Sequence, residues 1–404
     1  MLCLNVSAAC AHAGLVSSSP KSGELLSETP GQITLRFSET LEPDLVTIKL
    51  YDWNANEIAL PKPQLQAGDA VQVNVPLHPL PEGTYTVVWS VVSEDGHPVD
   101  DSFLFSVGQE SAAVKKPTEH QDTSGSGDLP LILLRYLVEG LILLGGGLYF
   151  VGRCARRYGL PAFSQTLGKE EKGISWLLLL VGTVCLWFGY AETLNGVSLT
   201  SALLEGRWEL LAQSPFAMML LAIFLLLILL AIPHMVEGWY AAIWVLLVGV
   251  LAAGGHVWGI HPVWLSLALR ILHVLSISLW LGALFYLVLI SRRTDVNQSG
   301  FKAMFLRIVA VSAILSVLSG ICMVMTQTEV SLLLQTVQTW SVLFANKLVL
   351  VAVMLIAAWR QTRRWGKGSP LSQPLLYGEW LAGIIVILLG VWMSQTNYPV
   401  FANM

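Results

Sequence analysis

Eight long apolar segments follow one another after residue 128, and they limit this chain more than any other feature. The 404-residue chain is 54% hydrophobic and only 12% charged, which predicts lipid rather than water around most of it. At about 1.5 Å per residue, a helix made from each segment is long enough to cross a bilayer. The expected spans are 129–151, 174–191, 216–232, 239–257, 263–290, 305–325, 341–359 and 377–394. Region 129–394 is therefore predicted to be an eight-helix membrane bundle, followed by a short tail, 395–404.

The loops between these segments differ sharply in basic residues. Alternate loops on one side hold thirteen Lys or Arg residues, whereas those on the other side hold only Arg207. The positive-inside rule places the basic loops in the cytoplasm. This predicts a multi-pass protein of the bacterial plasma membrane whose N-terminal region and C-terminus both lie outside the cell. The basic residues are Arg153, Arg156, Arg157, Lys169, Lys172, Arg292, Arg293, Lys302, Arg307, Arg360, Arg363, Arg364 and Lys367.

The region before the spans has the pattern of β structure. Apolar residues alternate with polar ones at Ile33, Leu35 and Phe37, and four further short runs are separated by Pro, Gly, Asp and Asn. Such spacing is typical of an antiparallel sandwich or barrel of about 90 residues, assigned here to 12–108, with a polar linker at 109–128. Between residues 12 and 128 there are 17 acidic and 6 basic residues. This charge attracts cations and argues against nucleic acid as a partner.

The first residues suggest export and a metal site. Residues 1–11 have the small-residue end of a secretory signal peptide, and cleavage after Ala11 would leave His12 as the new N-terminus. The free α-amine and imidazole of His12 would then chelate one ion, and Asp95 and His97 would complete the square of nitrogen and oxygen donors that Cu(II) prefers. A lipid-anchored Cys10 is an alternative reading of the same segment.

Ionisable groups inside apolar segments are costly and point to function. Arg135 and Glu139 lie one turn apart and are positioned to pair, and Arg270 shares a helix face with His273, about 15 Å from the expected outer end. From these spacings we predict a transport path through His256, His261, His273, Met323 and Met325, and an ion-paired frame of Arg135, Glu139, Arg270 and Lys347. Thioethers suit Cu(I). The plainer alternatives are a structural ion pair, simple packing of the methionines and a Lys347 side chain that extends to the interface.

The β region resembles the CopC family of extracytoplasmic copper-binding domains. The likeness is carried by Ala11-His12-Ala13, Ser19-Pro20, Arg36-Phe37-Ser38, Gly83-Thr84-Tyr85 and Ser93 through Val99. The resemblance implies a Greek-key β barrel, related to the immunoglobulin fold, that holds Cu(II) through His12, Asp95 and His97. Some members add a methionine-rich Cu(I) site. This chain has no methionine between residues 12 and 128, so that second site is not expected.

The helical region resembles CopD, a polytopic copper-resistance protein. Three motifs carry the likeness: His273 through Trp280-Leu281-Gly282, Ser319-Gly320, and Asn346-Lys347-Leu348. Where that family often has two glycines after the tryptophan, this chain has Gly282-Ala283. A CopC-like domain fused to a CopD-like bundle resembles copper importers of the YcnJ type.

These features predict a copper-acquisition protein that is not an enzyme. The exported domain would bind Cu(II) and the bundle would pass copper inward, with Cu(I) as a candidate species and a copper chaperone or reductase as a candidate partner. No Walker or Asp-Lys-Thr-Gly motif for ATP-driven transport occurs in the sequence. Two alternatives are a membrane redox enzyme with haem between His256 and His273 and a non-transporting protein that sequesters copper. Uptake and sequestration would use the same ligands.

Overall fold

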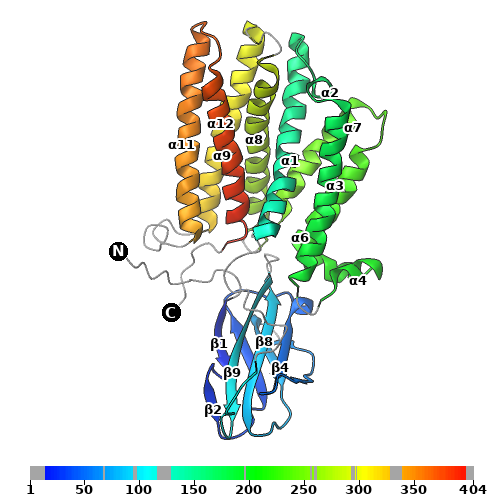
Figure 1. Ribbon diagram of the computed structural model, residues 1–404, viewed down its shortest axis with the longest axis vertical. Helices are drawn as coiled ribbons and strands as arrows, with labels where there is room; N and C mark the ends of the chain where they lie inside the picture. Colours follow the sequence, from blue (N-terminus) through cyan, green and yellow to red (C-terminus); the bar gives the residue numbers. More distant parts are fainter. Residues whose placement is uncertain are drawn as a thin grey trace. The chain divides into compact units, whose positions relative to one another are not determined.

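The chain forms two compact units, one built on β-sheets and one helical, in a computed structural model (Figure 1). The structure describes residues 14–66, 69–93, 98–115, 129–194, 197–254, 257–258, 262–292, 296, 298–327 and 339–396. The two units are considered separately.

Nine short strands form two sheets in the described part of the N-terminal region. The first sheet has the strand order β1 (Leu15–Ser19), β3 (Gln32–Phe37), β7 (Asp69–Pro76), β6 (Gln64–Gln66). The second has the order β2 (Glu24–Leu26), β9 (Pro98–Val107), β8 (Gly83–Val92), β4 (Thr47–Tyr51), β5 (Glu57–Ile58), and a short 3-10 helix, η1 (Pro43–Leu45), precedes β4. Strand β9 begins at Pro98, four residues before Ser102, where the sequence pattern predicts the last strand to begin. The expected β domain is confirmed.

Alternation of apolar side chains builds the core between the two sheets. In the first sheet, Ile33 pairs with Val75 and Leu35 with Val73, and all four side chains are fully buried. They pack in one cluster with inward-facing residues of the second sheet, including Leu50, Val87, Trp89 and Phe105. Because side chains alternate across a strand, the polar residues between these positions face outward. The period-two pattern therefore specifies both sheets.

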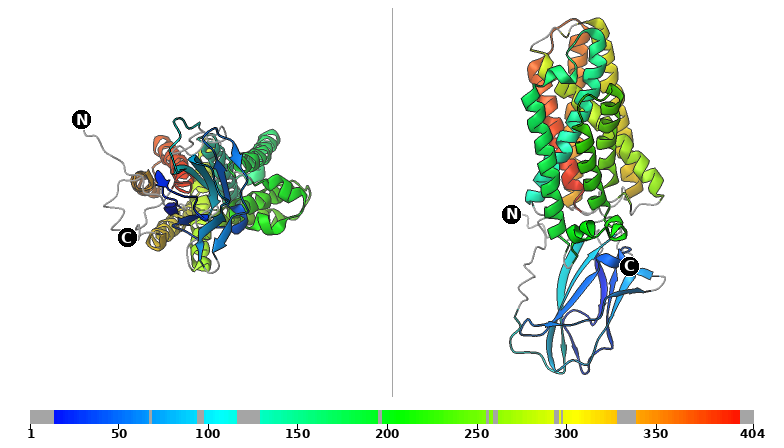
Figure 2. Two further views of the ribbon diagram at one scale, coloured as in Figure 1. Left: turned by 90° about the horizontal axis from the view of Figure 1, so that it is seen from below. Right: turned by 90° about the vertical axis from the view of Figure 1, so that its right-hand side faces the viewer.

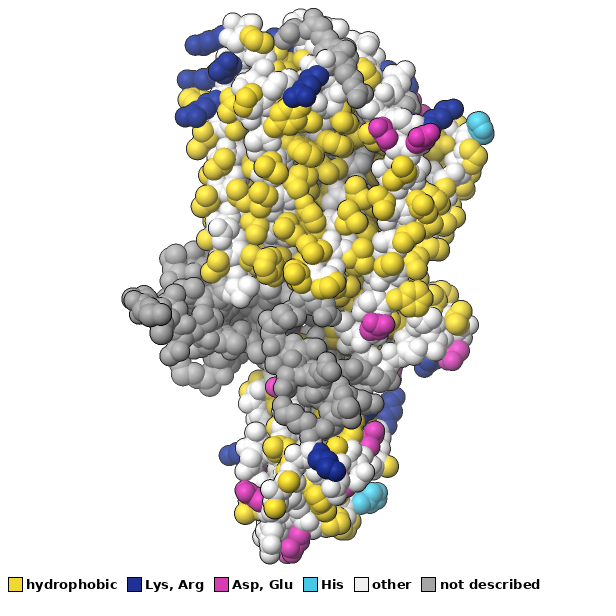
Figure 3. Space-filling view, in the orientation of Figure 1, with side chains coloured by type: hydrophobic (Ala, Val, Ile, Leu, Met, Phe, Trp, Pro, Cys, Tyr) yellow, Lys and Arg dark blue, Asp and Glu magenta, His cyan; other side chains and the backbone are white. Residues whose placement is uncertain are grey.

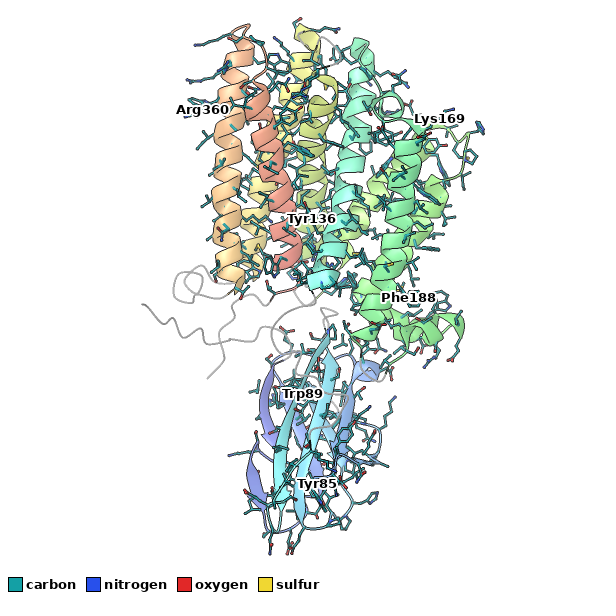
Figure 4. The ribbon with its side chains drawn as sticks, in the orientation of Figure 1. Tyr85, Trp89, Tyr136, Lys169, Phe188 and Arg360 are labelled. Carbon is teal, nitrogen blue, oxygen red and sulfur yellow. The ribbon has the colours of Figure 1, made fainter. Side chains whose placement is uncertain are left out.

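Tyr85 lies toward one end of the β domain, and Trp89 lies toward the other (Figure 4). The Tyr85 hydroxyl donates to the carbonyl of Pro81 at 2.6 Å, and its ring meets Trp53 edge-on at 6.0 Å. Gly83 has φ +152°, and a Cβ there would lie 2.4 Å from the Trp53 ring, so glycine is required. Burial, and then the negative charge of Asp52, raise the pKa of Tyr85.

The helical unit contains six helices in its described part that are long and apolar enough to cross a membrane. They begin with α1 (Leu129–Ala155) and α3 (Lys169–Glu192), and the long helices lie side by side in a bundle (Figure 2, right). The other four are α8 (Val263–Ile290), α9 (Ser299–Gln327), α11 (Thr339–Gly366) and α12 (Gln373–Met393). The short elements η2 (Arg156–Tyr158) and α2 (Phe163–Thr166) connect α1 to α3. The short helices α4 (Leu199–Leu204) and α5 (Trp208–Ala212) follow α3 in the segment Gly189–Pro215, which belongs to the same compact unit as the β domain.

The third and fourth expected spans are shorter than predicted. They form α6 (Pro215–Leu230), which has 16 residues, and α7 (Glu237–Val250) continued by η3 (Leu251–Ala253). Sixteen residues rise only about 24 Å, against the roughly 30 Å of a bilayer core. The cause at the shared turn is Pro233 followed by His234, whose φ of 61° ends helical geometry. The described residues thus form six long apolar helices and two shorter ones, and the expected count of eight spans is not confirmed.

Helices α1 and α8 meet without side chains between them. A Cβ on Gly147 would lie 1.8 Å from the carbonyl oxygen of Ser278, and one on Gly282 would lie 2.3 Å from the Cα of Gly147. Small residues at a crossing let two helix backbones touch, which is a common basis for helix association in lipid. Ser278 adds a hydrogen bond to the Leu143 carbonyl at 2.7 Å. This close contact fixes the position of α8, which carries Arg270, His273 and Trp280.

Basic side chains gather at one end of the helical unit, and hydrophobic ones cover its middle (Figure 3). Lys169 and Arg360 both lie toward this end in Figure 4. Contacts there join helix ends that are distant in sequence: Arg153 pairs with Glu237 at 3.2 Å, and Lys302 donates to the Trp365 carbonyl at 3.3 Å. We refer to it as the basic end.

Candidate functional site

The three residues predicted to bind Cu(II), His12, Asp95 and His97, lie outside the described residues. The structure does describe the positions next to them. Strand β8 ends at Val92 and pairs with Pro98 at the start of β9, so Asp95 and His97 belong to the connection between these strands. Gly14 lies two residues after His12.

Contacts around Ser38 and Leu41 bring these two flanking segments to the same end of the β domain. Gly14 exchanges hydrogen bonds with Ser38, through the Ser38 hydroxyl and its backbone N–H, both at 3.0 Å. Three residues later, Leu41 forms a β-bridge with Ser93, which is fully buried. Beneath them, Phe37 packs edge-on against Trp89 at 5.1 Å. The chain therefore carries the flanks of both predicted ligand segments to the Trp89 end of the domain.

In the helical unit, His273 is held by α9. Its Nδ1 lies 2.9 Å from the carbonyl oxygen of Ser316 and 3.1 Å from the Ser319 hydroxyl. A carbonyl only accepts, so Nδ1 carries the hydrogen and the lone pair is on Nε2. The ring also packs against Gly320, where a Cβ would lie 3.2 Å from its Cε1. The Ser319-Gly320 pair thus has a direct structural role: both residues contact His273.

Arg135 and Glu139 form the ion pair that their spacing predicts. The Arg135 Nε lies 2.9 Å from Glu139 Oε1, and both side chains are largely buried. Arg135 also donates to the Ser394 hydroxyl at 3.3 Å and lies over the Phe216 ring at 4.5 Å. These contacts tie α1 to the end of α12 and to the start of α6, so the pair has a structural role whatever else it does.

Arg270 and Lys347 extend this group toward His273. Arg270 interacts electrostatically with Glu139 and Arg135, and both Arg270 and Lys347 act on His273. The Lys347 ammonium lies beside Gly390 of α12: a Cβ added at this glycine would be 3.5 Å from the Lys347 Nζ. Two cations, Arg270 and Lys347, therefore act on the His273 imidazole, and Arg270 links it to the Arg135–Glu139 pair of α1. We call Arg135, Glu139, Arg270, His273 and Lys347 the polar cluster.

The remaining predicted path residues are not part of this cluster as the structure describes it. His256 and His261 lie outside the described residues. Met323 is half-buried on α9, and Met325 is 69% exposed, which places its thioether on the outer surface of the described helices.

One buried carboxylate is absent from the residues predicted from the sequence. Glu379, on α12, is only 3% exposed, although it lies inside the last apolar segment. Its Oε1 has no hydrogen bond of normal geometry, and the Trp280 indole of α8 is its polar neighbour. The rule that singled out Arg270 and Lys347, an ionisable group within a span, would also have found it.

A two-sheet domain followed by apolar helices with buried charges defines a multi-pass membrane protein with an N-terminal β domain. Residues 15–108 match the CopC domain family. The chain belongs to the CopC family, and the expected CopC–CopD fusion organisation is confirmed.

Three relatives show how far the likeness extends. Copper transport protein CutJ of Bacillus subtilis (strain 168) is 25% identical over 96% of this chain and 75% of its own length. Protein YobA of Escherichia coli (strain K12) is 37% identical over 24% of this chain and 79% of its own length. Copper resistance protein C of Xanthomonas campestris pv. juglandis is 37% identical over 24% of this chain and 82% of its own length. The likeness thus covers the β domain alone in two cases and nearly the whole chain in one.

Proposed function

We propose that this protein takes up copper across the bacterial plasma membrane. The β domain binds Cu(II) outside the cell through His12, Asp95 and His97, and the helical unit passes copper inward past His273. The observation that carries this proposal is the polar cluster. In it, the His273 imidazole is held inside an apolar helical bundle with its Nε2 free to bind a metal, and this bundle follows a CopC domain in the same chain. Similarity to a copper transport protein along 96% of the chain supports it.

The contacts at the Trp89 end support the Cu(II) site. His12 is two residues from Gly14, and Asp95 is two residues from Ser93, and these anchors are joined through Ser38 and Leu41. The reach of two residues is about 7 Å from each anchor. Amine, imidazole and carboxylate donors can therefore converge there without rearrangement of the sheets.

The geometry of His273 supports a transit ligand. Hydrogen bonding of Nδ1 to a backbone carbonyl leaves Nε2 as a metal-binding atom and orients the ring, as second-shell contacts do in metal sites. Arg270 and Lys347 oppose a cation at this point, and Glu139 offsets part of the charge of Arg270. The charge of the cluster therefore opposes a copper ion, and His273 offers a single ligand to it. This combination suits brief binding of copper during passage rather than storage.

The positions of the basic loops and of the turn between α6 and α7 support a topology with eight crossings. The basic end carries the loops that the positive-inside rule assigns to the cytoplasm (Figure 3). Glu237, at the start of α7, pairs with Arg153 and Arg156 at that end, so α6 and α7 form a hairpin that reaches it. Both termini then lie outside the cell, and the membrane potential draws copper inward, at about 2.3 kcal/mol per charge per 100 mV. A reductase that delivers Cu(I) and a cytoplasmic chaperone are the partners this scheme requires.

A deletion strain tests uptake directly. Cells that lack the gene should contain less copper than the parent when copper is limiting, and the wild-type gene should restore the copper content. Higher copper content in the deletion strain would indicate export, and unchanged content with lower copper tolerance would indicate sequestration. A Soret band in the purified protein would instead favour the haem enzyme.

A further inference from the structure

Unsatisfied polar atoms collect where α8 faces α12. Within the described residues, five buried side-chain nitrogen or oxygen atoms have no hydrogen bond of normal geometry, and four of the five lie at this contact. They are Trp280 Nε1, Gln373 Oε1, Glu379 Oε1 and Trp380 Nε1. Buried polar groups are normally paired, so a cluster of unpaired ones calls for a functional explanation.

Contacts along the two helices show that these groups form one row. At the basic end, the Gln373 amide donates to the Ser291 hydroxyl at 3.3 Å. Further in, the Trp380 ring stacks on Phe285 at 5.6 Å. Trp280 and Glu379 come next, followed by close packing of Gly383 against Leu281. We call this row the α8–α12 seam.

Glu379 is the ionisable group of the seam and has no cationic partner among the described residues. Arg292, which follows the end of α8, lies over the ring of Tyr377 near the start of α12 at 5.2 Å and is exposed. On α1, Tyr136 donates to the Ile384 carbonyl and is not charged (Figure 4). The charges of α1, α8 and α11, namely Arg135, Glu139, Arg270 and Lys347, act within the polar cluster, and none of them acts on Glu379.

A buried carboxylate without a counter-ion is costly when ionised, and this cost is removed by a proton or by a nearby cation. The seam also lies on the way from His273 to the basic end. Trp280 is seven residues beyond His273 on α8, a rise of about 10 Å. Glu379, which is next to Trp280, therefore lies between the level of His273 and the basic end.

We propose that Glu379 is a proton-exchange site that couples copper passage to proton release. The carboxyl group holds a proton at rest. When a copper ion moves from His273 into the seam, the O–H bond breaks, the proton leaves past Gln373 toward the basic end, and the carboxylate offsets one unit of the ion's charge. After the ion has left, the carboxylate takes up a proton again from the same side. No electron is transferred in this cycle. The proposal rests on the proposed function, because copper is the cation involved.

Infrared difference spectroscopy of the purified full-length protein tests the exchange. Titration with copper under ascorbate should reduce the carbonyl band of a protonated carboxylic acid in the wild type. The band should be absent in Glu379→Gln, which keeps the size and removes the titrating group, and shifted in Glu379→Asp. Glu192→Gln, at an exposed position at the end of α3, is the matched control and should behave as wild type. Normal elution of each variant in size-exclusion chromatography checks folding.

Two infrared results would overturn the proposal: a band that is unchanged in Glu379→Gln, or a wild-type band that copper leaves unaltered.

Right-side-out vesicles with a copper chelator inside give the second measurement. Copper entry through the wild type should slow at least about threefold as the pH of the lumen is lowered, because the proton of Glu379 is released there. The slower entry that remains in Glu379→Gln should not depend on this pH, and equal dependence in both proteins would also overturn the proposal. A wild-type protein that takes up no copper overturns the proposed uptake, whereas the infrared titration decides the exchange independently.

Discussion

The Nδ1 of His273 donates to the carbonyl oxygen of Ser316 across a distance of 2.9 Å, linking α8 to α9 inside the bundle. The Ser319 hydroxyl is itself used as a donor, to the Leu315 carbonyl at 2.6 Å, so it is left as a second acceptor for the same Nδ1. The ring is therefore fixed in orientation and tautomer before any ligand arrives. Preorganisation of this kind is typical of metal-binding histidines.

We predict that His273→Ala abolishes copper accumulation while Cu(II) binding by the β domain is unchanged. The substitution removes the Nε2 donor and leaves the β domain untouched. Cellular copper content at matched expression measures the first effect, and electron paramagnetic resonance of Cu(II) measures the second. His234→Asn, at an exposed position whose φ of 61° suits asparagine, is the control. Normal accumulation in His273→Ala would make this histidine structural only.

Gly282→Ala should destabilise the helical unit, because its methyl group would lie 2.3 Å from the Cα of Gly147. The two helices must separate to relieve this contact, and overpacking of this kind costs about 1–3 kcal/mol or more. The melting temperature of the detergent-solubilised protein should therefore fall. Gly249→Ala, where a Cβ has no neighbour within 4 Å, should leave it unchanged or raise it. Equal melting temperatures for the two variants would contradict the close approach of α1 and α8.

The β domain is predictable because one rule governs it: alternation buries one face. The rule places Ile33, Leu35 and Phe37 on a shared face, and all three are buried. The lengths of α6 and α7 are not predictable from hydropathy, since their apolar runs continue past the residues where the helices end. Pro233 marks that turn, but hydropathy alone gives it little weight.

The polar residues of the bundle are predictable to different degrees, for physical reasons. Arg270 and His273 are three residues apart, so a common face follows from helix geometry. Met323 and Met325 are two residues apart and cannot face the same side, so helix geometry alone separates them. Glu379 lies near the start of its apolar segment, where a carboxylate is expected to reach the interface. Its burial depends on the packing of α12 against α8, which one sequence does not reveal.

Asp52→Asn should weaken the β domain at neutral pH and less so in acid. Partial burial would raise the pKa of Asp52, but hydrogen bonds from the Asn56 side chain and from the backbone of Asn56 and Asn54 outweigh it and lower the pKa below 3.8. A lowered pKa in the folded state adds stability above 3.8 that disappears as the pH falls through the folded value. Because Asp52 is only partly buried, the effect should stay below about 1 kcal/mol.

Thermal unfolding of residues 12–108 at pH 7 and pH 3 would measure this difference. The hydrophobic core of the region lies between residues 33 and 107, and a relative is covered over 82% of its length by this part of the chain, so the fragment should fold alone. Glu57→Gln, in the neighbouring strand β5, is the control. A gap between Asp52→Asn and wild type that widens in acid would contradict the assignment.

The N-terminal chelate gives the sharpest test of the copper site. A fragment that starts at His12 should bind one Cu(II) with a tetragonal nitrogen–oxygen spectrum in electron paramagnetic resonance. The paramagnetic ion should quench the fluorescence of Trp89, which is buried at the same end of the domain.

One extra residue before His12 converts the chelating amine into an amide, and His97→Ala removes an imidazole. Each change should weaken binding at least about tenfold, equivalent to 1.4 kcal/mol. His78→Ala, at an exposed position away from the flanks, should have no effect. If the extended fragment binds as tightly as the original, the free terminus is not a ligand, and the alternative with a lipid-anchored Cys10 becomes the better reading.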